Sequence, residues 1–217
     1  MIHEKNLIVN KTARYYTLSE LTEKTKTVWI VFHGYGQLAK DFLAEFNILE
    51  NDSNFVIAPE ALNKFYLRGF TGKIGAAWMT KDDRENEIND YVQMTNKIFE
   101  SVKESVQLDK LKTNVLGFSQ GSQTAVRWLD KYRHKINKLI LWGGSFPRDC
   151  DYKNDYWSSI KSQIVIGNSD KFISDEMLEK EKLYLKSQNI QHSIINFDGG
   201  HELDNKTLIK ISNTFLP

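Results

Sequence analysis

The 217-residue sequence contains one cysteine, Cys150, and this scarcity excludes an internal disulfide bond. It is also typical of proteins from a reducing compartment. An excess of charge of one sign is missing as well, because 29 lysine and arginine residues nearly cancel 28 aspartate and glutamate residues. Nucleic acids and anionic membranes attract strongly basic surfaces, so this balance argues against both as partners. We therefore expect a cytoplasmic protein that binds no nucleic acid.

Long hydrophobic runs are absent too. No window approaches 18 uninterrupted apolar residues, the length that indicates a membrane-spanning helix. Residues 1–16 lack an apolar stretch of signal-peptide length. The chain has only three prolines and shows no repeat, linker or low-complexity segment. These absences predict no integral membrane association and one domain over residues 1–217.

Two kinds of apolar segment alternate along the chain. Short runs rich in β-branched residues predict strands at 27–32, 54–58, 114–116, 138–142, 163–167 and 192–197. Longer segments with apolar residues three and four positions apart predict helices at 38–49, 88–102, 120–132, 175–188 and 206–215. Several strand segments are almost continuously apolar, as expected where both faces of a parallel sheet are covered.

This alternation of strands and helices favours an α/β fold, with a mostly parallel central sheet and helices on both faces. The first 20 residues follow a different pattern. Residues 7–9 and 14–18 flank the short segment NKTA, which is a plausible turn. From this we predict an antiparallel hairpin at the edge of the sheet.

A serine lies between two glycines in Gly117-Phe118-Ser119-Gln120-Gly121. The pentapeptide alone is a weak signal, and a serine that caps the following helix is the alternative. A predicted strand precedes it and a predicted helix follows it, which is the context of a nucleophile elbow. It also stands at the carboxyl end of a strand, where open α/β sheets place their sites. Ser119 is therefore the candidate nucleophile.

A serine hydroxyl near neutral pH needs a general base, and the base needs an acid to orient it. His201 follows the last predicted strand on a glycine turn, from which it can reach back over the sheet. It is the candidate base, with an exposed loop histidine as the alternative. The other four histidines are less favourably placed: terminal His3, His134 near a helix end, His192 at a strand start, and His33 in an early glycine loop.

The candidate acid is Asp170, which directly follows the strand at 163–167. It stands between the candidate nucleophile and base, in the chain order Ser, Asp, His. A turn-forming aspartate is the alternative reading of this position. Asp149 and Asp151 follow the preceding strand and are the runners-up, whereas Asp198 is too near the candidate base in sequence for a favourable geometry.

Acyl transfer places negative charge on a carbonyl oxygen, and fixed backbone N–H groups stabilise that charge. The N–H of Gln120, the residue after the candidate nucleophile, is one expected donor. The glycine-flanked loop 32–36, with the sequence FHGYG, follows the strongest predicted strand. We expect the second donor to be the N–H of Tyr35. His33 is then interpreted as a residue that braces this loop rather than as a base.

The motifs FHGYG, GFSQG, GNSD and GGHE, in this order, resemble those of the α/β-hydrolase superfamily. Within it they are similar to the phospholipase/carboxylesterase family, which includes acyl-protein thioesterases. The resemblance covers about residues 24–216 and rests on these four short motifs. It implies an α/β-hydrolase fold with little or no lid, a triad with two oxyanion donors, and no metal or cofactor. The residues that it implies are Ser119, Asp170, His201, Tyr35 and Gln120.

Two segments depart from that family pattern. RDCDYKNDYW at 148–157 has no obvious counterpart, and the stretch 81–90 is strongly charged. The related dienelactone hydrolases use a cysteine nucleophile, and this branch is disfavoured because position 119 is serine.

The predicted function is hydrolysis of short to medium acyl esters by a serine carboxylesterase that forms an acyl-enzyme. Aromatic residues near the motifs suggest an apolar acyl or aryl group, although core packing is the alternative for most of them. The expected substrate contacts are Trp78, Met79, Phe118 and Phe146, with Tyr35 and Trp142 as further candidates. Segment 59–86 is a candidate cover of the site.

Other functions stay open at this point. The same triad would serve an acyl-protein thioesterase, a lysophospholipase or an acyltransferase. A non-catalytic binding module on this fold is a further alternative, and a peptidase lacks a feature that would anchor a peptide. The expected partner is a small ester or thioester. The natural substrate and the oligomeric state do not follow from the sequence.

Overall fold

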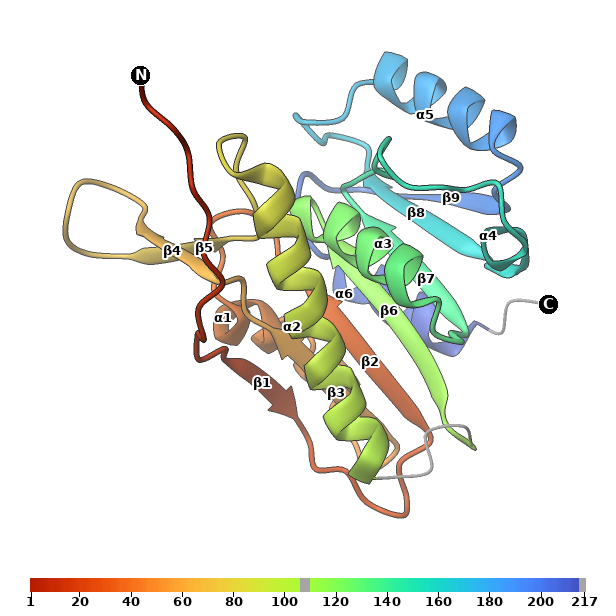
Figure 1. Cartoon of the computed structure of the whole chain (residues 1–217). Helices are drawn as coiled ribbons and strands as arrows, with labels where there is room; N and C mark the ends of the chain where they lie inside the picture. The colour runs from red at the N-terminus through yellow and green to blue at the C-terminus, as the bar shows by residue number, and fades with distance from the viewer. Residues whose placement is uncertain (106–109, 215–217) are drawn as a thin grey trace.

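The computed structural model describes residues 1–105 and 110–214, and its core is a seven-stranded sheet (Figure 1). The strand order is β1-β3-β2-β6-β7-β8-β9. All neighbouring strands are parallel except β1 and β3, which pair antiparallel at one edge. The strands are β1 (Tyr15–Leu18), β2 (Thr27–Phe32), β3 (Asn54–Pro59), β6 (Lys112–Phe118), β7 (Lys138–Trp142), β8 (Ser162–Gly167) and β9 (His192–Phe197).

The sheet is covered on both faces. In β2, Val28, Ile30 and Phe32 join one apolar cluster, while Trp29 and Val31 join the other. Successive side chains of a strand point to opposite faces, so a strand buried on both sides must be apolar throughout. The burial on both faces and the parallel pairing of the strands together confirm the mostly parallel, covered sheet that the sequence predicted.

Helices form the two outer layers. The longer helices are α2 (Arg84–Ser105), α3 (Gln120–Tyr132), α5 (Asp175–Ser187) and α6 (Asn205–Asn213). The shorter ones are α1 (Ala39–Ala44), the 3-10 turn η1 (Asn47–Leu49) and α4 (Asp155–Ser159). Figure 1 shows α2 and α3 on the near face of the sheet and α1 and α6 behind it.

The helices differ from the prediction in several places, and α2 extends beyond both ends of the range predicted at 88–102. The helix expected at 38–49 is two pieces, α1 and η1, and α4 was not predicted. The last helix, expected to reach residue 215, ends at Asn213, and residue 215 lies outside the described residues. Side-chain caps mark three of the starts: Asn154 accepts the N–H of Trp157, Ser174 that of Met177, and Asp204 that of Thr207.

The predicted N-terminal hairpin is wrong as a pair of strands, although the segment at 14–18 forms the expected antiparallel strand at the sheet edge. Only β1 forms, and residues 7–9 are exposed and form no strand. Polar side chains between residues 7–9 and β1 instead contact the residues that follow β3. The Lys11 amino group donates to the carbonyl oxygen of Leu62, and the Arg14 guanidinium binds the Glu60 carboxylate. These contacts hold the segment along the β3–β4 connection, so it does not fold back beside β1.

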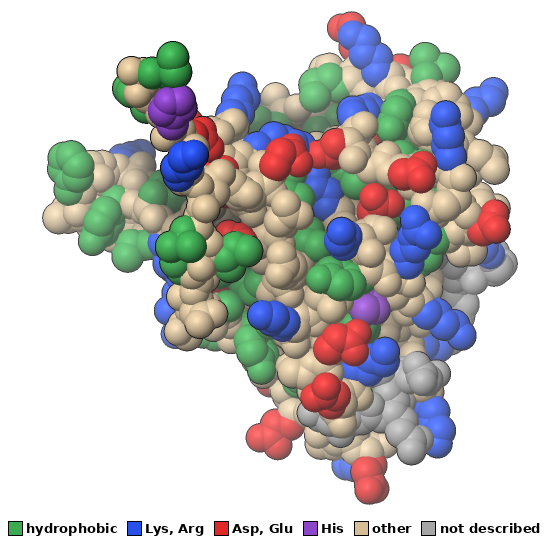
Figure 2. Space-filling view, viewed as in Figure 1, with side chains coloured by type: hydrophobic (Ala, Val, Ile, Leu, Met, Phe, Trp, Pro, Cys, Tyr) green, Lys and Arg blue, Asp and Glu red, His purple; other side chains and the backbone are tan. Residues whose placement is uncertain are grey.

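A hairpin that was not predicted lies in segment 59–86. Its strands β4 (Asn63–Tyr66) and β5 (Ile74–Ala77) form a separate two-stranded sheet that projects from the body (Figure 1). Hydrophobic side chains appear along this arm in Figure 2. The exposed ones are Tyr66, Leu67, Phe70 and Ile74. At its base, the Gly36 N–H donates to the Ala76 carbonyl oxygen at 2.8 Å, so the hairpin borders the loop that follows β2.

Within the described ranges, no helix combines the length and the apolar character needed to cross a membrane.

Candidate active site

Ser119 stands at the turn between β6 and α3, with φ 52° and ψ −117°. A non-glycine residue with positive φ is strained and needs support from its surroundings. Part of that support is the hydrogen bond from the Ser119 N–H to the Trp142 carbonyl oxygen, at 2.8 Å. The glycines on either side are required by close backbone approach: a Cβ at Gly121 would overlap the Phe32 carbonyl oxygen, and one at Gly117 would overlap Gly121.

His201 and Asp170 are hydrogen-bonded, with 2.7 Å between Nδ1 and Oδ2. The Asp170 side chain is 1% exposed and His201 is 17% exposed. The second carboxylate oxygen of Asp170 accepts the Phe172 N–H at 2.8 Å. A carboxylate at Nδ1 keeps the proton on that nitrogen, which leaves Nε2 free to act as a base. The His201 ring also packs against Phe118 and Phe172, with centroid separations of 4.9 and 4.7 Å.

A cavity of about 700 Å³ opens at the carboxyl ends of the strands. Ser119, His201, Tyr35 and Gln120 all line it. Asp170 lies behind His201 and is not part of the lining. The tertiary structure therefore brings together residues from four separate parts of the chain that the sequence had selected as site residues.

Two backbone N–H groups from residues that line the cavity have no hydrogen-bond acceptor in the part of the chain that the structure describes. One belongs to Gln120, the first residue of α3, and the other to Tyr35. The first N–H groups of a helix have no intrahelical partner, so the Gln120 N–H is free to bind a ligand. The Gln120 side chain binds the neighbouring loop, with Nε2 donating to the Met79 carbonyl oxygen and Oε1 accepting the Trp78 N–H.

His33 is fully buried beside this loop and is bound on both ring nitrogens. Nε2 accepts the Ala61 N–H at 3.1 Å, and Nδ1 lies 2.8 Å from the Gly34 carbonyl oxygen. Burial lowers the pKa of His33 to about 4, so the ring is neutral at physiological pH. Both nitrogens are occupied, and His33 does not line the cavity.

Three of the four expected substrate contacts lie elsewhere. Trp78 and Phe146 are each 1% exposed and belong to the core, and Met79 packs against that core. Of the four, only Phe118 lines the cavity. Trp78 points inward because its indole N–H finds a buried acceptor, the His33 carbonyl oxygen at 2.8 Å. Trp142 is also 1% exposed, and its indole N–H donates to the Glu202 carbonyl oxygen.

The sequence did not identify the wall of the cavity. That wall is aliphatic and comes from β8, the loop after it and the start of α5: Ile164, Ile166, Ile173, Met177 and Leu178. The apolar residues at the start of α5 were a usable signal, since they follow a strand end that already carried a candidate site residue. Three charged residues also line the cavity, Arg148, Lys180 and Glu181.

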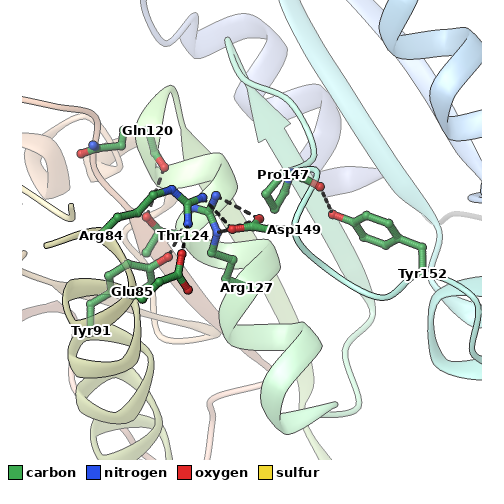
Figure 3. A network of polar contacts seen from close by, with 9 residues as sticks. All are labelled: Arg84, Glu85, Tyr91, Gln120, Thr124, Arg127, Pro147, Asp149 and Tyr152. Atoms are coloured by element: carbon green, nitrogen blue, oxygen red, sulfur yellow. Dashed lines mark hydrogen bonds and ion pairs between the residues drawn. The ribbon is translucent and has the colours of Figure 1, made fainter. Parts of the chain in front are cut away.

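Asp149, a runner-up for the acid, belongs to a different network (Figure 3). Its carboxylate binds Arg84 at 2.6 Å and Arg127 at 3.1 Å. Burial raises the pKa of Asp149, but the hydrogen bonds from the two arginines outweigh burial and leave this pKa below its usual range. Arg127 is 7% exposed and lies 3.5 Å from the Tyr91 hydroxyl. This network joins α2, α3 and the loop after β7.

Over the described residues, no group of three or more histidine, cysteine, aspartate or glutamate side chains could hold a metal ion.

A family model described as Serine hydrolase (FSH1) matches residues 22–211. No curated protein sequence matches the chain. Among solved structures, a phospholipase/carboxylesterase from Dyadobacter fermentans DSM 18053 is similar, with 18% identity and a TM-score of 0.68. The match covers 98% of this chain and 100% of that one. Acyl-protein thioesterase 2 from Zea mays gives 16% identity and a TM-score of 0.67 over 92% and 96% of the two chains.

A carboxylesterase from Bacillus cereus gives 16% identity and a TM-score of 0.62, over 93% and 92% of the two chains. At such identities the likeness concerns the fold, and it confirms the α/β-hydrolase architecture that the four motifs implied. The family match extends over most of the sequence, including the elbow at Ser119 and the loop of His201. The chain therefore belongs to the serine hydrolase (FSH1) family, within the α/β-hydrolase class.

Proposed function

We propose that this serine hydrolase is a carboxylesterase, a single domain over residues 1–217, which hydrolyses short to medium acyl esters through an acyl-enzyme. In this proposal Ser119 is the nucleophile, His201 is the general base and Asp170 orients the base. The observation that supports it most is the 2.7 Å hydrogen bond between His201 and the buried Asp170, beside a cavity that Ser119 also lines.

The reaction has two acyl-transfer steps. Ser119 Oγ attacks the ester carbonyl carbon while His201 Nε2 takes the hydroxyl proton. The carbonyl oxygen becomes an oxyanion and accepts the N–H groups of Tyr35 and Gln120. The C–O bond to the alcohol then breaks, and His201 protonates the alcohol as it leaves. A water molecule repeats the sequence on the acyl-enzyme and releases the acid.

The carboxylate of Asp170 acts through His201. Its Oδ2 keeps the imidazole in the tautomer with the proton on Nδ1, and it stabilises the imidazolium that forms in each step. Its Oδ1 is held by the Phe172 N–H, so the carboxylate has one fixed orientation. The wall from β8 and α5 is aliphatic, which favours an apolar acyl group as the bound part of the substrate.

Covalent labelling tests the nucleophile. A fluorophosphonate probe should label the wild-type protein and Ser145→Ala, which removes another serine from the cavity lining. Ser119→Ala should not be labelled, because in this proposal the Ser119 hydroxyl is the nucleophile that His201 activates. Labelling of Ser119→Ala at the wild-type level would overturn the assignment.

The acyl-length preference has its own test. With p-nitrophenyl esters from acetate to palmitate, we expect kcat/KM to fall steeply for the longest chains. Comparable values for acetate and palmitate would overturn the preference for short to medium chains.

Thioester hydrolysis by the same residues is the second candidate, favoured by the likeness to acyl-protein thioesterase 2 from Zea mays. Oxygen esters and thioesters of one acyl group, assayed side by side, separate the two activities. An added alcohol acceptor in the same assay detects acyl transfer. The cytoplasmic location and the absence of a nucleic-acid partner stay predictions.

A further inference from the structure

The aliphatic wall of the cavity is interrupted by charged side chains. Glu181 on α5 is 7% exposed, and both of its carboxylate oxygens have donors. Oε1 accepts the Phe146 N–H at 2.9 Å, and Oε2 accepts Arg148 Nη2 at 2.5 Å. Lys180, the third charged lining residue, pairs at 2.6 Å with Glu176, and both of these side chains are mostly exposed. Glu181 is thus fully engaged, and Lys180 is paired near the surface.

Arg148 is held in a fixed position. Besides the ion pair with Glu181, its guanidinium carbon lies 3.5 Å from the centre of the Tyr184 ring. Stacking of this kind restricts the planar group to one orientation. A guanidinium has five N–H donors, and only Nη2 has an acceptor among the described residues. The side chain is 50% exposed and lines the cavity, so the remaining donors are available to a ligand.

A purely apolar acyl group offers no hydrogen-bond acceptor to an arginine side chain. An uncharged chain placed against a guanidinium would shield it from water and leave its donors unsatisfied, which is unfavourable. A carboxylate fits the same place, because two N–H groups of an arginine can bind its two oxygens in parallel. Prior fixation by Glu181 and Tyr184 reduces the conformational entropy that binding would otherwise cost.

We propose that Arg148 is the anion-binding group of the cavity, and that the preferred substrates are esters whose acyl chain carries a second carboxylate. This inference rests on the proposed esterase function. The ester carbonyl lies at Ser119, a short aliphatic chain contacts the wall from β8 and α5, and the distant carboxylate binds Arg148. The carboxylate is bound and not consumed, so the chemistry of the two acyl-transfer steps is unchanged.

The experiment compares two esters of equal chain length, p-nitrophenyl hexanoate and the p-nitrophenyl monoester of adipic acid. For the wild-type protein, we expect kcat/KM to be higher for the adipate ester by about tenfold or more, the effect of one hydrogen-bonded ion pair. Arg148→Met should bring the ratio of the two values near one. Arg148→Lys should give an intermediate ratio, because an ammonium keeps the charge but not the planar pair of donors.

Two controls separate recognition from damage to the fold. Arg68→Met removes an exposed arginine on the β4–β5 hairpin, which does not line the cavity, and should keep the wild-type ratio. Arg148→Met alone would leave the buried Glu181 carboxylate without its ion-pair partner. The double variant Arg148→Met/Glu181→Gln removes that unpaired charge. A purely structural role of Arg148 would lower both kcat/KM values together and leave their ratio unchanged, and this result would overturn the proposal. A wild-type ratio near one would overturn it too.

A binding measurement distinguishes failure of the proposed esterase function from failure of the proposed anion site. If wild-type protein hydrolyses neither ester, the proposed function fails, and titration calorimetry with free adipate then tests Arg148 by itself. Adipate binding by the wild-type protein that is lost in Arg148→Met would support the anion site. Equal binding by both proteins, or binding by neither, would overturn it.

Discussion

The imidazole Nδ1 of His33 lies 2.8 Å from the carbonyl oxygen of Gly34. Because the other ring nitrogen accepts the Ala61 N–H, the proton is on Nδ1 and is donated to that carbonyl. The Gly34 carbonyl and the Tyr35 N–H belong to one planar trans peptide and point in opposite directions. His33 therefore sets the direction of the Tyr35 N–H, which we propose as an oxyanion donor.

Replacing His33 should reduce turnover more than substrate binding. His33→Asn removes the hydrogen bond from the imidazole Nδ1 to the Gly34 carbonyl oxygen, so the orientation of the Tyr35 N–H toward the oxyanion is less well fixed. We expect kcat to fall by up to about 10²-fold, the lower end of the effect of losing one donor. The KM should change little, because His33 does not line the cavity. Steady-state kinetics with a short p-nitrophenyl ester measure both. His134→Asn changes a partly buried histidine that does not line the cavity and should keep kcat. An unchanged kcat in His33→Asn would contradict the role.

His33 should also make stability depend on pH. Its folded-state pKa is about 4, below the ordinary value of 6.5, so the unfolded chain binds a proton more readily between these values. The contribution is fully present above about pH 6.5 and is lost as the pH falls toward about 4; the shift corresponds to about 3 kcal/mol. Urea unfolding of the wild-type protein and His33→Asn over this range measures it. Their difference in free energy of unfolding should shrink as the pH falls, and a constant difference would contradict the assignment.

Asp170→Asn should nearly abolish turnover without unfolding the protein. An amide at this position stabilises the imidazolium poorly and permits the wrong tautomer of His201, so we expect kcat to fall by about 10³- to 10⁴-fold. Burst and steady-state kinetics measure the loss, and the melting temperature checks the fold. Asp149→Asn is the matched control, since it weakens the contacts with Arg84 and Arg127 outside the cavity. Asp149→Asn should lower the stability and leave kcat near the wild-type value. Loss of kcat in Asp149→Asn but not in Asp170→Asn would show that Asp149 is the acid.

Trp78→Phe tests whether this aromatic residue contacts the substrate. Phenylalanine keeps most of the buried packing but leaves the His33 carbonyl oxygen without its indole donor. We expect the free energy of unfolding to fall by about 1–3 kcal/mol, the cost of an unsatisfied buried polar group. The KM for short esters should stay within about twofold, because Trp78 does not line the cavity. A large rise in KM with unchanged stability would show that Trp78 contacts the substrate, as the sequence suggested.

The elbow itself should store strain that glycine relieves. Both Ser119→Gly and Ser119→Ala remove the hydroxyl, but alanine must still adopt φ 52°. Glycine populates positive φ readily, so we expect Ser119→Gly to be more stable than Ser119→Ala by about 1 kcal/mol. Thermal melting of the two inactive variants measures the difference. Greater stability of Ser119→Ala would show that the turn is not strained.

The strands of the parallel sheet were predictable because burial on both faces requires continuous apolar runs. The elbow was predictable because a strained turn between strand and helix admits only glycine at Gly117 and Gly121. Chain order left Asp149, Asp151 and Asp170 as candidates, and the end of the strand next in sequence to that of His201 favoured Asp170. The Asp170 and His201 side chains are hydrogen-bonded, and their catalytic role stays a prediction. In each case the requirement is local, or follows from the rule that parallel strands end at one edge of a sheet.

Other features depended on contacts between distant segments. Hydrophobicity marked Trp78 and Phe146 as apolar, but only the indole contact with His33 and the packed core show that they face inward. The hairpin expected near residues 7–18 does not form, and Lys11 and Arg14 instead contact residues that follow β3. Arg148 and Glu181 lie 33 positions apart (181 − 148), and nothing in either segment indicates that they pair in the lining of the cavity. The sequence by itself determined the parallel sheet with its covering helices, and it placed the candidate catalytic residues at the strand ends. The tertiary structure decided which side chains line the cavity, because each side chain's direction depends on the long-range partners that satisfy it.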